Sequence, residues 1–170
     1  KDYVTAFKEW RELAQEGNAA AQNNLAVMYG EGAGVPQDHE EAAKWYRRAA
    51  EQGHQVAQFN LGVLYANGLG VRQDYKEAAE WYRRAAELGD ASARFNLGLL
   101  YADGTGVEQS DVEALAWVTL ARSIKYYESR FDEVEQARLK LLGRMTPEEI
   151  ADAERLANAR SAASARKPSH

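Results

Sequence analysis

The sequence predicts an all-α fold, a solenoid of antiparallel helix pairs, and three observations support this prediction. The 170 residues include only three prolines, while alanine, leucine, glutamate and arginine are abundant, a mixture that favours helix. Hydrophobic residues make up 45% and charged residues 28%, as in ordinary globular proteins rather than disordered ones. The sequence also repeats itself every 36 residues, a period typical of stacked helical repeats.

The repeat is visible as closely similar segments. AAKWYRRAAEQG begins at Ala42, and AAEWYRRAAELG begins at Ala78. Other positions keep the same register in three successive copies: Asn24, Asn60 and Asn96; Tyr29, Tyr65 and Tyr101; Gly34, Gly70 and Gly106; and Trp45, Trp81 and Trp117. This register divides the chain into repeats at 18–53, 54–89 and 90–125.

Each repeat is predicted to form two helices. In the middle copy, Ala57, Leu61 and Leu64 fall on one face of the first helix. Ala78 and Trp81 share a face of the second helix, so the tryptophans are expected in the core rather than as ligand-stacking groups. The turn YANGLGVRQD separates the two helices, because glycine adopts backbone angles that other residues resist.

Capping signatures mark the ends of the second helices. An acceptor side chain followed three residues later by glutamate is the pattern of a capping box. The four pairs are Asp38 and Glu41, Asp74 and Glu77, Ser110 and Glu113, and Thr146 and Glu149. Gly53 and Gly89 are predicted C-terminal caps. The arginine pairs near these ends, Arg47–Arg48 and Arg83–Arg84, are interpreted as complements to the helix dipole.

The fourth capping box predicts a degenerate capping repeat over residues 126–160. Its first helix is expected from about Tyr127 to Leu142, with Phe131, Val134 and Leu141 buried. The second helix would place Ile150, Ala153 and Ala157 where repeat three has Ala114, Trp117 and Ala121.

The remaining segments complete one repeat domain over residues 1–160. Residues 1–17 are expected to form a lone second helix, a half repeat, and residues 161–170 a flexible tail without periodicity. Because the half repeat and the cap each leave one face without a neighbour, end-to-end self-association is a further expectation.

The repeat pattern resembles a known family. A-x-x-x-L-G-x-x-Y-x-x-G-x-G-V followed by D-x-x-x-A-x-x-W-Y-x-x-A-A-x-x-G is similar to the Sel-1-like repeat, a relative of the tetratricopeptide repeat. Repeat one departs at Ala26, where glycine is usual, and repeat three at Val118, where tyrosine is usual. The resemblance implies a right-handed α-α superhelix that serves as an adaptor in bacterial signalling or envelope complexes. It favours the periplasm or the exterior over the cytoplasm.

The same resemblance implies an alternative function. One secreted branch of the family is cysteine-rich, with a disulfide in each repeat, and members of it are described as binding β-lactams. The alternative is therefore an exported cell-wall protein or a β-lactam-binding protein or hydrolase. This chain has no cysteine, so the disulfides of that branch have no counterpart here.

A second apolar stripe on the first helices suggests where a partner binds. Val56, Phe59 and Val63 lie roughly opposite the Leu61 stripe. Two interpretations stay open: a groove on the concave face that binds a partner protein or peptide, or packing between successive first helices. The candidate partner-binding residues are Asn23, Asn24, Val27, Val56, Phe59, Asn60, Val63, Phe95, Asn96 and Leu99.

Two roles are open for the asparagine row. The amides of Asn24, Asn60 and Asn96 could pair with the backbone of an extended peptide, or each could tie its helix to the glycine loop. If the apolar stripe is a groove, Phe59→Asp combined with Phe95→Asp should keep helicity and abolish partner capture.

The residue inventory argues against several other functions. A net charge of −5 does not suit nucleic acid, and no apolar run reaches the about 18 residues that a membrane span needs. No two of the three histidines are spaced for a helical zinc site, so no metal or cofactor is expected. Gly32–Ala33–Gly34 follows a helix rather than a strand, unlike a phosphate loop. No nucleophile, base and oxyanion donor occur together, so the prediction is a non-catalytic protein-interaction scaffold.

Overall fold

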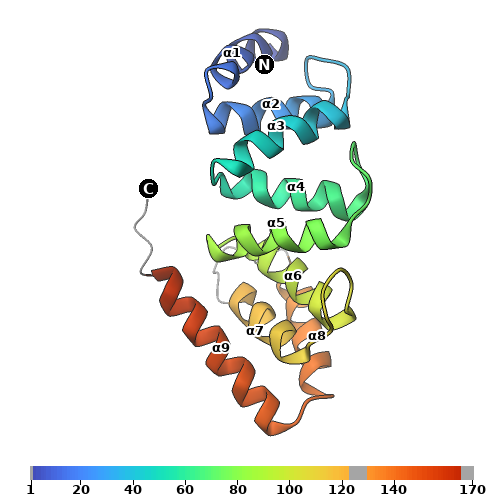
Figure 1. The fold of residues 1–170 in the computed structure, drawn as a ribbon, viewed down its shortest axis with the longest axis vertical. Helices are drawn as coiled ribbons and strands as arrows, with labels where there is room; N and C mark the ends of the chain where they lie inside the picture. Colours follow the sequence, from blue (N-terminus) through green and yellow to red (C-terminus); the bar gives the residue numbers. More distant parts are fainter. Residues whose placement is uncertain (1, 123–129, 166–170) are drawn as a thin grey trace. The chain divides into compact units, whose positions relative to one another are not determined.

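The computed structural model describes residues 2–122 and 130–165, and within them every regular element is an α-helix (Figure 1). The predicted all-α class is therefore confirmed. The chain divides into two compact units, unit 1 up to Trp81 and unit 2 from Tyr82 onwards. The helices are α1 (Tyr3–Gln15), α2 (Ala19–Glu31), α3 (His39–Glu51), α4 (Gln55–Asn67), α5 (Tyr75–Glu87), α6 (Ala91–Asp103), α7 (Asp111–Arg122), α8 (Phe131–Leu142) and α9 (Pro147–Ala165).

The predicted N-terminal caps are present, but only one box closes in both directions. The Asp38 carboxylate accepts from the Glu41 backbone N–H at 3.0 Å, and Asp74 and Ser110 cap α5 and α7 in the same way. At α9, the Glu149 N–H donates to the Thr146 hydroxyl while the Glu149 carboxylate accepts from the Thr146 N–H at 2.8 Å. In the other three boxes the N-cap backbone N–H donates to a tyrosine carbonyl of the preceding helix instead: Asp38 to Tyr29, Asp74 to Tyr65 and Ser110 to Tyr101.

The connection between the two helices of a repeat is closed by glycine and glutamine. Gly68 follows α4 with φ of +67°, the left-handed conformation that ends a helix. The Gln73 side-chain amide then donates to the Ala66 carbonyl at 2.7 Å. Gln37 and Gln109 donate to Gly30 and Ala102 in the same way in the neighbouring repeats. Each loop is therefore fixed by a hydrogen bond within its own repeat.

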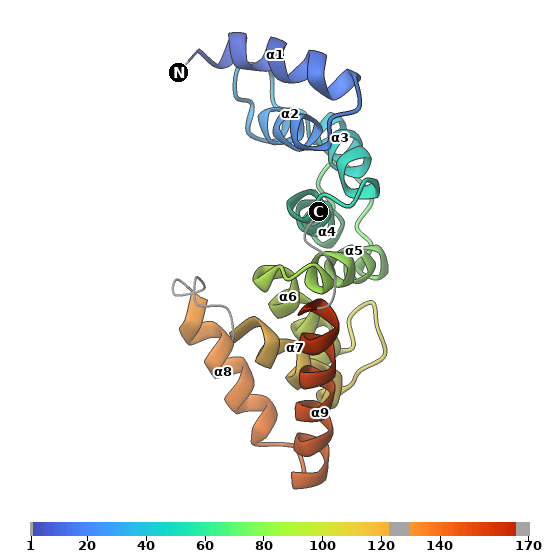
Figure 2. The same ribbon diagram turned by 90° about the vertical axis from the view of Figure 1, so that its left-hand side faces the viewer.

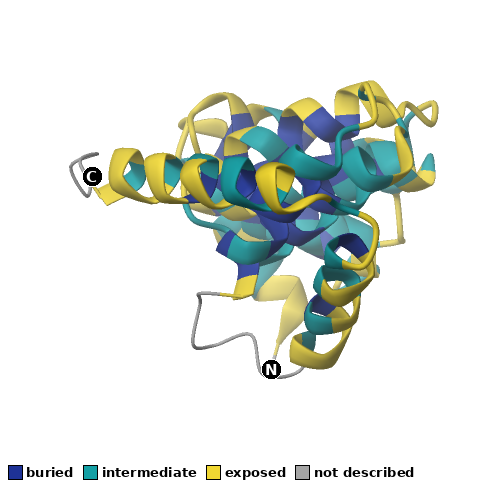
Figure 3. Cartoon of the chain, turned by 90° about the horizontal axis from the view of Figure 1, so that it is seen from below, coloured by how far each residue is buried: buried dark blue, intermediate teal, exposed yellow. Residues whose placement is uncertain are grey.

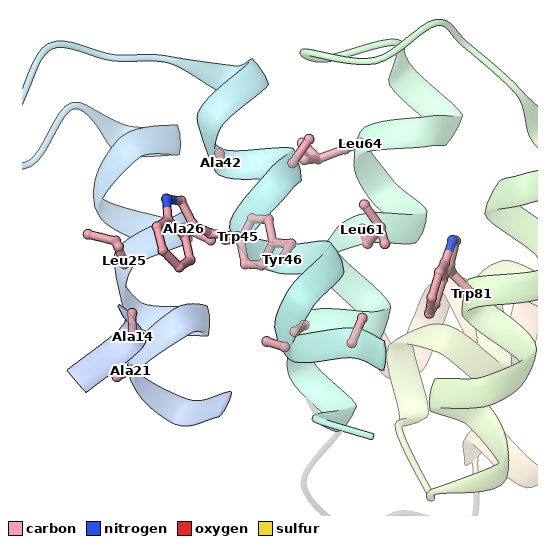
Figure 4. Packing of buried hydrophobic residues seen from close by; sticks show 14 residues of the cluster. Ala14, Ala21, Leu25, Ala26, Ala42, Trp45, Tyr46, Leu61, Leu64 and Trp81 are labelled. Carbon is pink, nitrogen blue, oxygen red and sulfur yellow. The ribbon is translucent and has the colours of Figure 1, made fainter. Parts of the chain in front are cut away.

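In unit 1 the core consists of large side chains set among alanines. Leu25 and Leu61 are fully buried, and Trp45 and Trp81 belong to the same cluster. Figure 4 shows these side chains between the helices, with Ala21 and Ala42 beside them. Alanine leaves room for close helix approach, and the tryptophans fill the remaining volume. The predicted core role of the tryptophans is confirmed.

In unit 2, α7 lies between α8 and α9 and contacts both (Figure 2). Trp117 and Val118 of α7 are buried. Val118 stands at the position of Tyr82, and Gly98 lets it approach α6 closely: a Cβ on Gly98 would lie 2.8 Å from a Val118 methyl carbon. The missing Cβ of Gly98 thus makes room for the branched Val118 side chain where α6 and α7 pack closely.

The capping helices differ in part from the prediction. Val134 and Leu141 are buried as expected, but burial of Phe131 was wrong, since its side chain is 45% exposed with the Arg122 guanidinium over its ring at 5.8 Å. Phe131 is the first residue of α8, so helical spacing alone did not decide its burial. The expected helical start at 127–129 lies outside the described residues.

Helix α9 extends beyond residue 160, where the predicted tail began. It runs to Ala165, and the Ser164 hydroxyl donates to the Glu87 carbonyl at 3.3 Å. Figure 3 shows that the side of α9 facing the rest of unit 2 is more buried than its outer side. The small residues of RSAASA allow this continuation, because alanine favours helix and serine permits it.

Candidate partner-binding site

A groove of about 300 Å³ lies between α1 and α2 in unit 1. From α2 it is lined by Asn24 and Val27, two of the predicted partner-binding residues, together with Met28. From α1 it is lined by Tyr3, Ala6 and Trp10. The surface is thus mainly apolar and aromatic, with one amide in its wall. The sequence-based list contained no α1 residue, although Trp10 occupies the register position held later by Tyr46 and Tyr82.

The second and third asparagines of the row are engaged inside the protein. Asn60 and the Tyr46 hydroxyl share a hydrogen bond, and so do Asn96 and the Tyr82 hydroxyl. Each bond joins the first helix of a repeat to the second helix of the preceding repeat. The structural partner of these two amides is therefore a tyrosine of the preceding helix, rather than the glycine loop.

The first asparagine differs because its tyrosine is replaced. Trp10 stands where Tyr46 and Tyr82 stand, and an indole has no hydroxyl. The Asn24 side-chain oxygen accepts from the Asn23 amide at 3.5 Å, a long hydrogen bond. Asn24 is half-buried in the wall of the groove. Asn24 therefore lines the groove without the tyrosine contact that Asn60 and Asn96 have.

The neighbouring residue of α2 is a buried amide. Asn23 stands at the register of Phe59 and Phe95 and is only 8% exposed. Among the described residues its side-chain oxygen has no hydrogen-bond partner. The next two repeats have phenylalanine at this position. The face of α2 that carries Asn23 is therefore more polar than the corresponding faces of α4 and α6.

Helix α4 exposes part of the predicted stripe in unit 1. Val56 is 47% exposed, and Phe59 and Val63 are half-buried. The first turn of α4 therefore leaves an apolar side chain, Val56, in contact with solvent.

In unit 2 the corresponding face is covered. Phe95 is 3% exposed, with the Arg130 guanidinium 4.9 Å from its ring centre. Leu99 lines a small cavity of about 90 Å³ together with Val118 of α7 and Leu141 of α8. Here the face of α6 packs against the next helices. The Phe95→Asp change is therefore expected to destabilise unit 2, so the double variant no longer separates binding from folding.

The tyrosine in the Asn60 pair predicts an alkaline transition. Burial, helped by the Glu31 carboxylate, raises the pKa of Tyr46 from 10.0 to about 12. Because the pKa of Tyr46 is raised in the folded state, the neutral Tyr46 side chain contributes fully to the free energy of unfolding below about pH 10. This contribution is lost as the pH rises through about 12. We expect the free energy of unfolding to fall over this window. Tyr46→Phe should flatten the fall in urea titrations, while Tyr75→Phe, at an exposed tyrosine, should not.

Two classes of site have no candidate in the described part of the chain. No group of three or more histidine, aspartate or glutamate side chains is arranged to hold a metal ion there. Over the same residues, no helix combines the length and the apolar composition that crossing a membrane requires.

Comparison with known proteins agrees with this architecture. The Sel1 repeat model matches residues 19–54, 55–90 and 91–123. A protective antigen present in uropathogenic Escherichia coli strains, which displays an SLR fold, is 32% identical with a TM-score of 0.79, over 96% of this chain and 36% of that one. A Sel1 repeat protein from Oxalobacter formigenes is 31% identical with a TM-score of 0.72, over 94% of this chain and 64% of that one.

The chain thus spans less than two thirds of the length of either solved protein. No curated protein matches it. Three consecutive repeat matches nevertheless cover more than half of the sequence. The chain belongs to the Sel1 repeat family, whose members generally act as protein-interaction scaffolds.

Proposed function

We propose that this chain is a non-catalytic scaffold that holds an extended segment of a partner protein in the α1–α2 groove. The observation that carries the proposal is the change at one register position. In the next two repeats, Tyr46 and Tyr82 form hydrogen bonds with the amides of Asn60 and Asn96. Trp10 stands at the corresponding position of α1 and has no hydroxyl, so the Asn24 amide in the groove wall lacks this bond.

The groove chemistry suits a segment with an apolar side chain. Tyr3 and Trp10 offer large, stiff surfaces that lose little conformational entropy on binding. The Asn24 amide has two donors and an acceptor, which match the N–H and C=O groups of an extended backbone. Aromatic rings would thus supply the affinity, and the amide would set the orientation of the segment.

The exposed stripe of α4 extends this surface within unit 1. We assign Val56, Phe59 and Val63 to a second contact with the same partner. The covered positions Phe95 and Leu99 are left with a packing role. Since the groove contains neither a general base nor a nucleophile beside one, the scaffold is proposed to act by binding alone.

The test is a binding measurement on groove variants. Proteins captured by the immobilised chain from a lysate of its source cells would be identified by mass spectrometry. The segment protected from proteolysis would then be synthesised as a peptide and titrated. We expect Tyr3→Ala and Asn24→Asp each to weaken peptide binding about tenfold or more, since each removes a contact worth about 1.4 kcal/mol or more.

Matched controls separate binding from folding. Tyr3 is exposed, so its truncation should leave helicity and thermal stability unchanged. Leu139→Asp alters an exposed apolar residue of α8, far along the chain, and should bind as the wild type does. Equal peptide affinity for the wild type and both groove variants would show that the partner does not use this groove.

A further inference from the structure

A cavity of about 330 Å³ lies in unit 2, and none of its lining residues belongs to the proposed partner site. Its apolar wall includes Trp117 and Leu120 of α7. Three arginines reach it from three helices, Arg83 of α5, Arg94 of α6 and Arg160 of α9, with Glu87 as the acidic residue of the lining. The repeat pattern accounts for Arg83, the counterpart of Arg47, but not for Arg94 or Arg160.

The first cation is specific to repeat three. Gln22 and Gln58 occupy the register of Arg94, and their side-chain amides donate to Ala14 and Ala50 carbonyls at 3.1 Å. The Arg94 Nε donates to the equivalent carbonyl, Ala86, at 3.0 Å. Glutamine therefore meets the structural requirement of this position in two repeats, and arginine adds a charge to it.

That charge is buried. Arg94 is 7% exposed, and its Nη1 also donates to the Leu120 carbonyl at 3.2 Å. Burial lowers the pKa of Arg94, against a smaller opposing effect of Asp90. Placing a cation where a neutral amide suffices has a desolvation cost. A bound anion would offset this cost.

The second cation has unused hydrogen-bonding capacity. The Arg160 guanidinium lies 4.2 Å from the Trp117 ring, and its Nη2 donates to both Glu113 carboxylate oxygens at 2.9 and 3.1 Å. Its Nη1 is buried and has no hydrogen-bond partner among the residues that the structure describes. The same is true of the Trp117 indole N–H.

The surrounding charges limit the class of anion. Glu87 lines the cavity, Glu113 pairs with Arg160, and Asp90 lies near Arg94. These acids partly balance the arginines, which favours a monoanion over a dianion such as phosphate. The Trp117 and Leu120 wall favours an organic body over an inorganic ion.

We propose that this cavity binds a small organic carboxylate. Its charged head lies between Arg94 and the Nη1 of Arg160, and its apolar body lies against Trp117 and Leu120. Guanidinium donors match a carboxylate in geometry as well as charge. This site is independent of the α1–α2 groove, so either one can fail without the other.

The test uses 4-phenylbutyrate, its neutral amide and inorganic phosphate as probes of the folded chain. Calorimetry measures affinity, and the Trp117 indole N–H resonance, assigned with Trp117→Phe, reports the location. We expect 4-phenylbutyrate to bind with a Kd of roughly 1 mM or lower and to shift this resonance. The amide and phosphate should each bind about tenfold more weakly or not at all.

Arg94→Gln is the decisive variant, because it installs the residue that repeats one and two already use. It should keep the Ala86 contact and the fold, and lose about tenfold or more in 4-phenylbutyrate affinity. Arg155→Gln, at an exposed arginine of α9, should bind as the wild type does. Three results would each overturn the proposal. Folded Arg94→Gln could bind 4-phenylbutyrate as tightly as the wild type does, the amide or phosphate could bind as tightly as 4-phenylbutyrate, or 4-phenylbutyrate could fail to bind the wild type.

Discussion

Replacing Gly70 by alanine is expected to destabilise unit 1 by more than about 3 kcal/mol, because two costs coincide at this residue. Gly70 has φ of +66°, and a Cβ there would overlap the His39 carbonyl and lie 2.5 Å from the Glu40 nitrogen. Both neighbours are backbone atoms at the start of α3, so neither can move without disturbing that helix. Urea unfolding followed by circular dichroism would measure the loss.

Gly53→Ala isolates the conformational part of that cost. Gly53 has φ of +87°, but a Cβ added there would have no other atom within 4 Å. We expect a loss of about 1–2 kcal/mol, the penalty for a left-handed backbone alone. Similar losses in Gly53→Ala and Gly70→Ala would mean that the loop moves away from α3 at little cost.

Trp81→Ala is expected to lower the free energy of unfolding by about 3–5 kcal/mol. Trp81 is 5% exposed and belongs to the cluster that holds Leu61 and Leu64. Alanine would leave a cavity among side chains that are already small, and the surrounding alanines cannot expand to fill it. The measurement is the midpoint and slope of equilibrium denaturation.

Tyr75→Ala provides the comparison on the same helix. Tyr75 is an exposed aromatic residue of α5, so its removal should cost less than about 1 kcal/mol. A Trp81→Ala loss no larger than that of Tyr75→Ala would contradict the core role of the tryptophan.

The periodic features of this fold could be predicted because they depend on nearby residues. A capping aspartate such as Asp38 acts on an amide three positions away, and the Trp45 register follows from helix geometry. These local rules recur in each repeat, so agreement between copies strengthens the prediction. Phe131 shows the limit: it shares the register of the buried Phe95, yet its side chain is 45% exposed, so register alone does not determine burial.

The sites depend on contacts that no spacing rule reveals. Arg160 reaches Trp117 and Glu113 from a helix more than one repeat later. The α1–α2 groove depends on Trp10, which periodicity alone places in the core. In both cases the information lies in departures from the repeat: Arg94 in place of glutamine, and Trp10 in place of tyrosine. Comparing copies position by position could have identified these residues.

The glutamine bonds that close the loops have an engineering consequence. Because Gln37, Gln73 and Gln109 each bind a carbonyl of their own repeat, a duplicated copy would bring its loop conformation with it. Inserting a second middle repeat should therefore lengthen the array by one module without redesign of the turns. The length of the array could thus be adjusted by adding whole repeats of 36 residues.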